Sequence, residues 1–289
     1  MNIENGLEEL MKEISSFNGV CLSLVERLKL ESTLDQLKSD IKCDEMQFWG
    51  IIYGSEKDYY IAKALYYKNY PLFPKKKYYF CNSSNFIFSE LPSLNPHQLP
   101  NFHKYNTYFI GNPDIILEKY EVEKNNNLDD ELTEGNFKPL TRKKNMTETD
   151  RLSYVVRAID RDTSVVPVGG YKMLPINEIR RNDIFEGINS EDLGKIEKYL
   201  HFRPVENQEK IDKINMGKAV FDFDFLDSIS DDSIKDTWSI QLDSTKTTCS
   251  LRSLVWPGYF AYCKANSDQF GGVYFGYGIK NVDIPFMQQ

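Results

Sequence analysis

Histidine is scarce in this chain, and the catalytic motifs that usually contain it are missing. Only three histidines, His97, His103 and His201, occur in 289 residues, and none belongs to an H-E-x-x-H pattern. The G-x-S-x-G and G-x-x-x-x-G-K-[ST] signatures are also missing. A histidine base needs a partner within reach, and no motif here supplies one. We therefore predict no catalytic residue, no metal site and no cofactor.

Cysteine, long apolar runs and positive charge are also in short supply. The five cysteines form no C-x-x-C pair, which argues against a disulfide framework or a structural zinc site. No stretch approaches the roughly 18 apolar residues of a membrane span, and the N-terminus does not resemble a signal peptide. With 35 basic and 43 acidic residues, the formal charge is −8, which disfavours a general nucleic-acid binder. We expect an intracellular, soluble protein that binds neither membranes nor nucleic acid.

Two helical patterns occupy residues 1–42. The first is an apolar face with helical spacing (Leu7, Leu10, Met11 and Ile14), which ends at the turn signal Asn18-Gly19. Ser23 and Glu26 have the spacing of a capping box, so a second helix should begin after Ser23. Its apolar stripe is expected to pack on the core (Leu30, Leu34, Leu37 and Ile41).

Aromatic residues are abundant, with 18 Tyr and 18 Phe, and they fall in short runs typical of strands. The N-terminal runs lie between residues 46 and 90, and the last four form a C-terminal meander over 236–287. Between them, residues 152–159 have the spacing of a buried helix, and 165–171 read as a strand. Asn189 or Ser190 should begin a short helix that carries Leu193, Ile196 and Leu200. The pattern predicts an α+β fold, with N-terminal helices packed on an antiparallel sheet.

Residues 121–147 differ in composition from the rest of the chain. They contain dense charge and few core residues, which is typical of a flexible polar insertion at the surface. We predict that the whole chain, 1–289, is one domain interrupted by this segment.

Asp222 and Asp224 form the one carboxylate pattern that suggests chemistry. The D-x-D spacing in FDFDFLD is similar to the metal- and nucleotide-sugar-binding pair of many glycosyltransferases. In a strand, both side chains would share one face, but a solvated strand face shows the same alternation. A metal-dependent transferase therefore stays an alternative function, as does a general cytoplasmic interaction module.

Several sequence blocks, in order, resemble one family. The blocks are FWGIIYGSEKDYYIAKAL at 48–65, TWSIQLD at 237–243, LRSLVWPGYFAY at 251–262 and GGVYFGYGIKNVDIPFM at 271–287. Together they resemble the radial spoke head protein 9 family, the shorter relatives of the radial spoke head 4/6 proteins. The chain departs from the pattern at Ile51, where the family usually has a basic residue, and in the 121–147 insertion.

The resemblance implies a non-enzymatic structural subunit of the radial spoke head in the axoneme of motile cilia. Its implied role is to build the head and to relay central-pair signals that control dynein-driven beating. The implied partners are other spoke head subunits, chiefly the 4/6 paralogues, and the central-pair apparatus through the assembled head. The family-block residues are expected to serve the fold or an interface (Phe48, Trp49, Gly50, Asp58, Tyr59, Tyr60, Trp238, Arg252, Trp256, Pro257 and Gly258).

Overall fold

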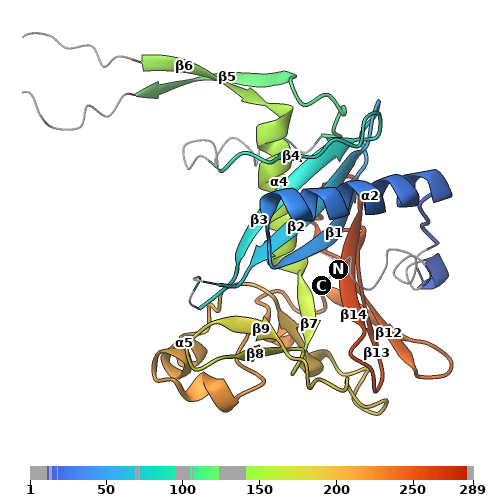
Figure 1. Ribbon diagram of the computed structural model, residues 1–289, viewed down its shortest axis with the longest axis vertical. Helices are drawn as coiled ribbons and strands as arrows, with labels where there is room; N and C mark the ends of the chain where they lie inside the picture. Colours follow the sequence, from blue (N-terminus) through green and yellow to red (C-terminus); the bar gives the residue numbers. More distant parts are fainter. Residues whose placement is uncertain are drawn as a thin grey trace, which may run out of the picture.

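The computed structural model describes residues 12, 15–17, 19–68, 70, 72–94, 105, 107–123 and 141–284 (Figure 1). Its helices are α2 (Leu24–Ile41), α4 (Glu148–Thr163) and α5 (Gln208–Asn215), with 3-10 turns η3 (Ile196–Lys198), η4 (Lys218–Phe221) and η5 (Ile229–Asp231). The N-terminal strands are β1 (Glu45–Ile52), β2 (Tyr59–Tyr66), β3 (Lys75–Asn82), β4 (Ser89–Glu90), β5 (Ile116–Glu123) and β6 (Thr141–Thr147). The others are β7 (Val165–Pro167), β8 (Tyr171–Met173), β9 (Ile179–Arg181), β10 (Tyr199–His201), β11 (Trp238–Leu242), β12 (Thr248–Ser253), β13 (Tyr259–Lys264) and β14 (Phe270–Gly276).

One eight-stranded sheet organises the fold, in the order β11-β12-β13-β14-β1-β2-β3-β4. The C-terminal strands β11 to β14 form the expected antiparallel meander. The N-terminal strands β1 to β4 form a second antiparallel set. The two sets meet where β1 runs parallel to β14, so the sheet is mixed and not wholly antiparallel. The first and last strands of this sheet in chain order, β1 and β14, therefore lie side by side.

Gly50 makes this parallel junction possible. A Cβ at this position would lie 2.0 Å from the carbonyl oxygen of Tyr274, and the backbone φ is +143°, which side-chain-bearing residues rarely adopt. The register of β1 against β2 also shifts between Phe48 and Gly50, the signature of a β-bulge. The bulge shifts the alternation by one residue, so Phe48 and Ile51 face the same core although they are three residues apart.

Two aromatic-rich cores cover the two faces of the sheet, with α2 and α4 on opposite sides (Figure 1). Helix α2 packs on one face through Leu30 and Leu34, both fully buried. Its predicted capping box is confirmed, because Ser23 and Glu26 bond each other's backbone N–H groups. The predicted N-terminal stripe at residues 7–14 lies outside the described residues, so it stays a prediction.

Helix α4 covers the opposite face, as its periodicity predicts. Leu152, Val156 and Ile159 are fully buried in the larger core. Glu148, in the first turn, is also buried, and its carboxylate accepts hydrogen bonds from the Tyr59 hydroxyl and from the backbone N–H groups of residues 110–112. This carboxylate fastens the loop before β5 to the helix and the sheet.

One local prediction is wrong, and one pattern that a strand could have produced is not a strand. Residues 189–200 form turns and the short η3, not one helix, because Leu200 instead pairs with Val166 in the small β10–β7 sheet. His201 therefore lies in a strand and not at a helix end. Residues 222–227 do not form a strand either, since η4 ends at Phe221 and the chain continues as a loop.

The predicted fold class is confirmed: an α+β fold with an N-terminal helix on the sheet and a C-terminal meander. The two ends of the 121–147 segment pair as the hairpin β5–β6, which extends away from the body in Figure 1. Residues 124–140 lie outside the described part of the chain, so the flexibility of this segment stays a prediction. Among the described helices, none is long and apolar enough to span a bilayer.

Candidate assembly surface and buried polar centre

The family-block residues are mainly buried in the fold. Phe48, Trp49, Tyr59, Tyr60, Trp238 and Trp256 belong to the two cores or their edges, and each is less than a tenth exposed. Asp58, Arg252 and Gly258 are half-buried, whereas Pro257 is exposed in the turn between β12 and β13. Arg252 donates to the carbonyl of Phe17 and thereby ties β12 to the segment before α2. A role of these residues in an interface stays a prediction.

All three tryptophans of the chain donate their indole N–H to an aspartate. The pairs are Trp49 with Asp160 at 3.2 Å, Trp238 with Asp232 at 3.1 Å and Trp256 with Asp162 at 2.9 Å. A buried indole N–H needs such a partner, because an unmet donor in a core is unfavourable. Each pair joins a strand or turn of the sheet to a segment outside it.

Asp160 is the centre of a buried polar cluster between α4 and the sheet. It binds Lys63 at 3.0 Å and Lys76 at 2.6 Å, and it accepts the Tyr78 hydroxyl at 2.9 Å. Burial alone would raise the pKa of Asp160, but the two lysines outweigh burial and hold it well below its usual range. Burial lowers the pKa of Lys76 to about 8, with Asp160 opposing that shift. The cluster therefore contains two cationic groups around one carboxylate.

The sequence contains a signal for this cluster, although the cluster matches no catalytic motif. Asp160 continues the i, i+4 row of Leu152 and Val156, so it falls on the apolar face of α4. Lys63 has the same parity as Ile61 and Leu65, which places it on the core-facing side of β2. A buried charge needs a partner of opposite sign, so Asp160 on α4 and Lys63 on β2 are predicted to pair.

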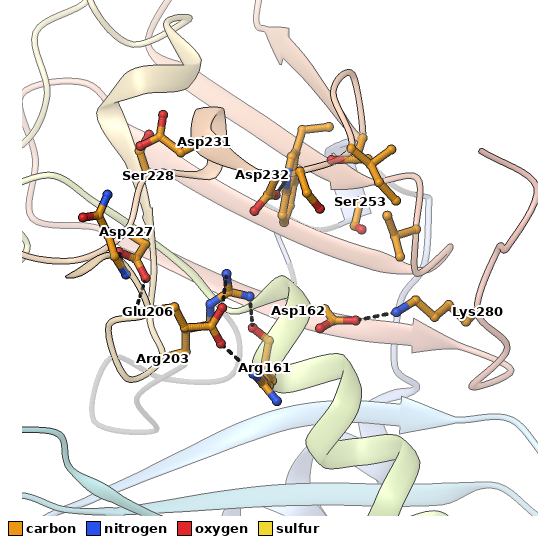
Figure 2. A pocket seen from close by; sticks show the side chains of 16 residues that line it. Arg161, Asp162, Arg203, Glu206, Asp227, Ser228, Asp231, Asp232, Ser253 and Lys280 are labelled. Carbon is orange, nitrogen blue, oxygen red and sulfur yellow. Dashed lines mark hydrogen bonds and ion pairs between the residues drawn. The ribbon is translucent and has the colours of Figure 1, made fainter. Parts of the chain in front are cut away.

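An open pocket, about 530 Å³ in volume, lies beside α4 and β11 (Figure 2). It is lined by five carboxylates, and the structure gives each of them a donor within the protein. The donors are Lys280 for Asp162, Arg161 for Glu206, two backbone N–H groups for Asp227, Ser230 for Asp231, and His201 with Trp238 for Asp232. These contacts tie segments of the fold together and give each carboxylate at least one internal donor.

Asp222 and Asp224 lie apart from this pocket, at the surface. Asp224 pairs with Lys210 at 3.0 Å, and Asp222 lies 4.0 Å from Lys213. The backbone N–H of Asp224 also donates to the Asp222 carboxylate, as in a local turn. Within the described residues, no group of three or more His, Cys, Asp or Glu side chains has the arrangement of a metal site. The two aspartates are thus engaged by lysines of α5.

Three tyrosines cluster at the ends of β1 and β14, two of them exposed and one, Tyr53, half-buried. The Tyr277 ring contacts Tyr53 at 5.5 Å and Tyr108 at 5.1 Å between centroids. Tyr277 is 53% exposed and Tyr108 62% exposed, although both are large aromatics. Tyrosine offers a rigid, amphipathic contact area and is enriched at protein interfaces. We call Tyr53, Tyr108 and Tyr277 the tyrosine cluster.

The two edges of the large sheet differ in how they are protected. The β4 edge consists of two residues, and the neighbouring β3 begins with three lysines, both of which discourage edge pairing. The β11 edge has five uncharged residues, WSIQL, without proline or a bulge. Along an antiparallel strand, every second residue hydrogen-bonds to the neighbouring strand. Thr237 and Asp243 bond to the chain at either end of β12, so the N–H groups of Trp238, Ile240 and Leu242 point away from β12. No backbone hydrogen bond within the described residues reaches these groups.

These features define a class of protein: an α+β fold built on one wide mixed sheet, with aromatic cores on both faces and an open edge. The family model described as radial spokehead-like protein matches residues 2–70 and 205–289. The chain belongs to this family.

Curated relatives match almost end to end. The chain is 32% identical over 276 residues to the radial spoke head protein 9 homolog of Danio rerio, covering 95% of this chain and 96% of that protein. It is 32% identical over 281 residues to the Homo sapiens homolog and 30% identical over 285 residues to the Mus musculus homolog, with 96% and 97% of the two chains covered in each case. The family resemblance found in the sequence blocks is confirmed.

Proposed function

We propose that this chain is a non-enzymatic structural subunit of the radial spoke head in motile cilia and flagella. The observation that carries the proposal is the similarity to radial spoke head protein 9 homologs over at least 95% of both chains. The engagement of Asp222 and Asp224 by lysines supports a role without metal-dependent transfer. In this role the protein is made in the cytoplasm and incorporated into the axoneme.

The proposed partners are other spoke head subunits, chiefly the 4/6 paralogues, and the central-pair apparatus through the assembled head. The free β11 edge supports strand pairing with a 4/6 paralogue, because its outward backbone groups are available for a ladder. The tyrosine cluster offers a second contact surface with little entropy to lose. Through these contacts the subunit would help to build the head and to relay central-pair signals to dynein.

Deletion of the gene in a ciliated cell tests the proposal, with cryo-electron tomography of axonemes and video analysis of beating as readouts. We expect spoke heads to be missing or incomplete and the beat to be altered, and we expect wild-type protein to restore both. Intact heads with a normal beat would contradict the proposed function.

A matched pair of rescue variants tests the β11 edge. Leu242→Pro removes an outward N–H that β12 does not use, whereas Leu242→Ala shortens the same side chain and keeps that N–H. We expect the alanine variant to restore the heads and the proline variant to restore them poorly, at similar thermal stability. Equal rescue would reject the edge contact and leave the subunit role standing.

A further inference from the structure

A second open pocket, about 430 Å³ in volume, lies between the start of β3, the C-terminal half of α4 and residues 203–206 after β10. Part of its wall is apolar (Phe73, Pro74, Pro204 and Val205). Its charged lining is mainly basic (Lys76, Arg157, Arg161 and Arg203). We call it the cationic pocket, and its charge balance is unusual for a chain with a net charge of −8.

Lys76 brings unbalanced charge to the floor of the cationic pocket. Its ammonium group binds Asp160 at 2.6 Å, but Asp160 also binds Lys63 from behind, at 3.0 Å. One carboxylate thus serves two lysines, which leaves one positive charge without a counterion. Lys76 also donates to the carbonyl of Phe202 and lies 4.9 Å from the centre of that ring.

Arg157 adds a second cation in the wall that has no direct ion pair. Its guanidinium contacts the carbonyl and hydroxyl oxygens of Ser153 and lies 5.3 Å above the centre of the Tyr78 ring. No carboxylate of the described residues forms an ion pair with it. Burial lowers the pKa of Arg157 below its ordinary value, while the nearby Tyr78 and Glu90 oppose that shift.

Arg161 and Arg203 form the rim, where they share one carboxylate. Glu206 lies 2.6 Å from Arg161 and 3.5 Å from Arg203. The Nε–H of Arg203 is buried and has no hydrogen-bond acceptor. An unmet buried donor on a guanidinium is unfavourable unless an acceptor arrives. In the lining of the pocket, four cations therefore stand against two carboxylates, a surplus of two positive charges. Outside the lining, Lys63 adds a cation behind Asp160, and Glu90 and Asp162 act on Arg157 and Arg161.

We infer that the cationic pocket is a docking site for an acidic segment of a partner protein. Guanidinium groups bind carboxylates through paired N–H donors, and partly desolvated cations gain most from an incoming anion. The proline and phenylalanine wall would accept an apolar side chain next to the acidic ones. The inference rests on the proposed function only in that the partner is a neighbouring protein of an assembly.

The pocket of Figure 2 lies next to the cationic pocket and favours binding of an acidic segment from one side only. It shares Arg161, Arg203 and Glu206 with the cationic pocket but has five carboxylates and three cations in its lining. An acidic segment is repelled from that side and attracted to this one. The net charge of −8 also opposes nonspecific binding of acidic peptides elsewhere on the surface.

Fluorescence anisotropy with the purified full chain tests the inference. The probe is a labelled peptide, Glu-Glu-Leu-Glu-Glu-Leu, and its control has every Glu replaced by Gln. We expect saturable binding of the acidic peptide alone, weakened about tenfold by Arg157→Gln, as loss of a buried charge partner predicts. Arg161→Gln, at a mostly exposed position that carries less folding risk, should weaken binding by a smaller factor. Lys195→Gln, the same charge change in an exposed ion pair outside the pocket, should have no effect.

Three outcomes would overturn the inference. One is no binding of the acidic peptide up to about 1 mM, the range of very weak complexes. Another is equal weakening by Lys195→Gln, which would indicate general electrostatic attraction. The third is displacement of the peptide by inorganic phosphate at equal charge concentration, which would indicate a small-anion site. None of these results depends on whether spoke heads form in cells, so the subunit role is tested separately.

Discussion

Asp160 connects side chains from three neighbouring strands to α4. Trp49 comes from β1, Lys63 from β2, and Lys76 and Tyr78 from β3. A buried ion pair adds little net stability compared with an apolar pair, but loss of one partner leaves a buried charge uncompensated. Because Asp160 is the shared partner of both lysines, we expect its substitution to destabilise the fold more than that of any other residue in the cluster.

We predict that Asp160→Asn lowers the free energy of unfolding by about 3–5 kcal/mol at pH 7, the range for a broken buried ion pair. Urea denaturation measures it. Because the pKa of Asp160 is lowered on folding, its stabilisation is full above the unfolded carboxyl pKa of about 3.9 and is lost progressively below it. The gap between wild type and variant should therefore narrow as the pH falls from about 5 to about 3.

Asp183→Asn is the control for this prediction. Asp183 is 86% exposed and lies 3.4 Å from Lys172, so its removal should change stability by less than about 0.5 kcal/mol. Equal losses in the two variants, or a gap that does not depend on pH, would show that the negative charge of Asp160 does not contribute to stability.

At the scale of elements, the parallel contact between β1 and β14 joins the two antiparallel halves of the sheet. The register pairs Gly50 with Tyr274, and the strands approach closely because Gly50 has no Cβ. Trp49 and Tyr274 then pack on the same side, with ring centroids 5.4 Å apart. The lack of a side chain at Gly50 thus permits the close contact that joins the N-terminal and C-terminal strand sets.

We predict that Gly50→Ala destabilises the fold by at least about 3 kcal/mol, because the new Cβ would clash with backbone and the φ is strained. Gly217→Ala is the matched control, with φ +69° and no atom within 4 Å of the new Cβ. It should lose only about 1 kcal/mol, the strain of a left-handed backbone. Thermal unfolding of both variants distinguishes them, and similar midpoints would argue against the close approach.

At the scale of the whole molecule, the sheet separates two cores and contributes side chains to both. We propose that residues 1–289 form a single domain, because the first and last strands of the chain's sheet are paired. Both cores contain buried thiols: Cys249 and Cys263 on the α4 side, and Cys43 and Cys81 on the α2 side. The reactivity of these four thiols therefore shows whether both cores are intact.

We predict that one thiol, Cys21, reacts rapidly with Ellman's reagent in the folded protein at pH 8, and that the other four react only on unfolding. Cys21 is exposed, whereas the others are buried, and burial raises the pKa of Cys81 and of Cys263 to about 12. Cys21→Ser should abolish the rapid phase. More than one rapid thiol would show that one of the cores opens in the native state.

Local signals in the sequence predicted much of this fold. Ser23 and Glu26 begin α2 through their own hydrogen bonds, and the alternating runs of β11 to β14 needed only neighbouring strands to pair. The helix predicted through Leu200 was wrong because a distant partner, Val166, offered a strand edge. The segment with the D-x-D pattern at Asp222 is a loop and not a strand. Alternation within a short segment does not show whether a neighbouring strand is available to pair with it.

The sequence alone determined the fold class, the meander and the family, since these depend on residue order and local periodicity. Only the tertiary structure decided which charges meet: Asp160 with Lys63, and Arg161 with Glu206, come from positions far apart in the chain. The same holds for two of the three tryptophans, since Trp49 and Trp256 donate to aspartates 111 and 94 positions away, whereas Trp238 donates to Asp232, six residues before it. Electrostatic partners are set by distance in space, and sequence spacing fixes that distance only within a helix turn or a hairpin.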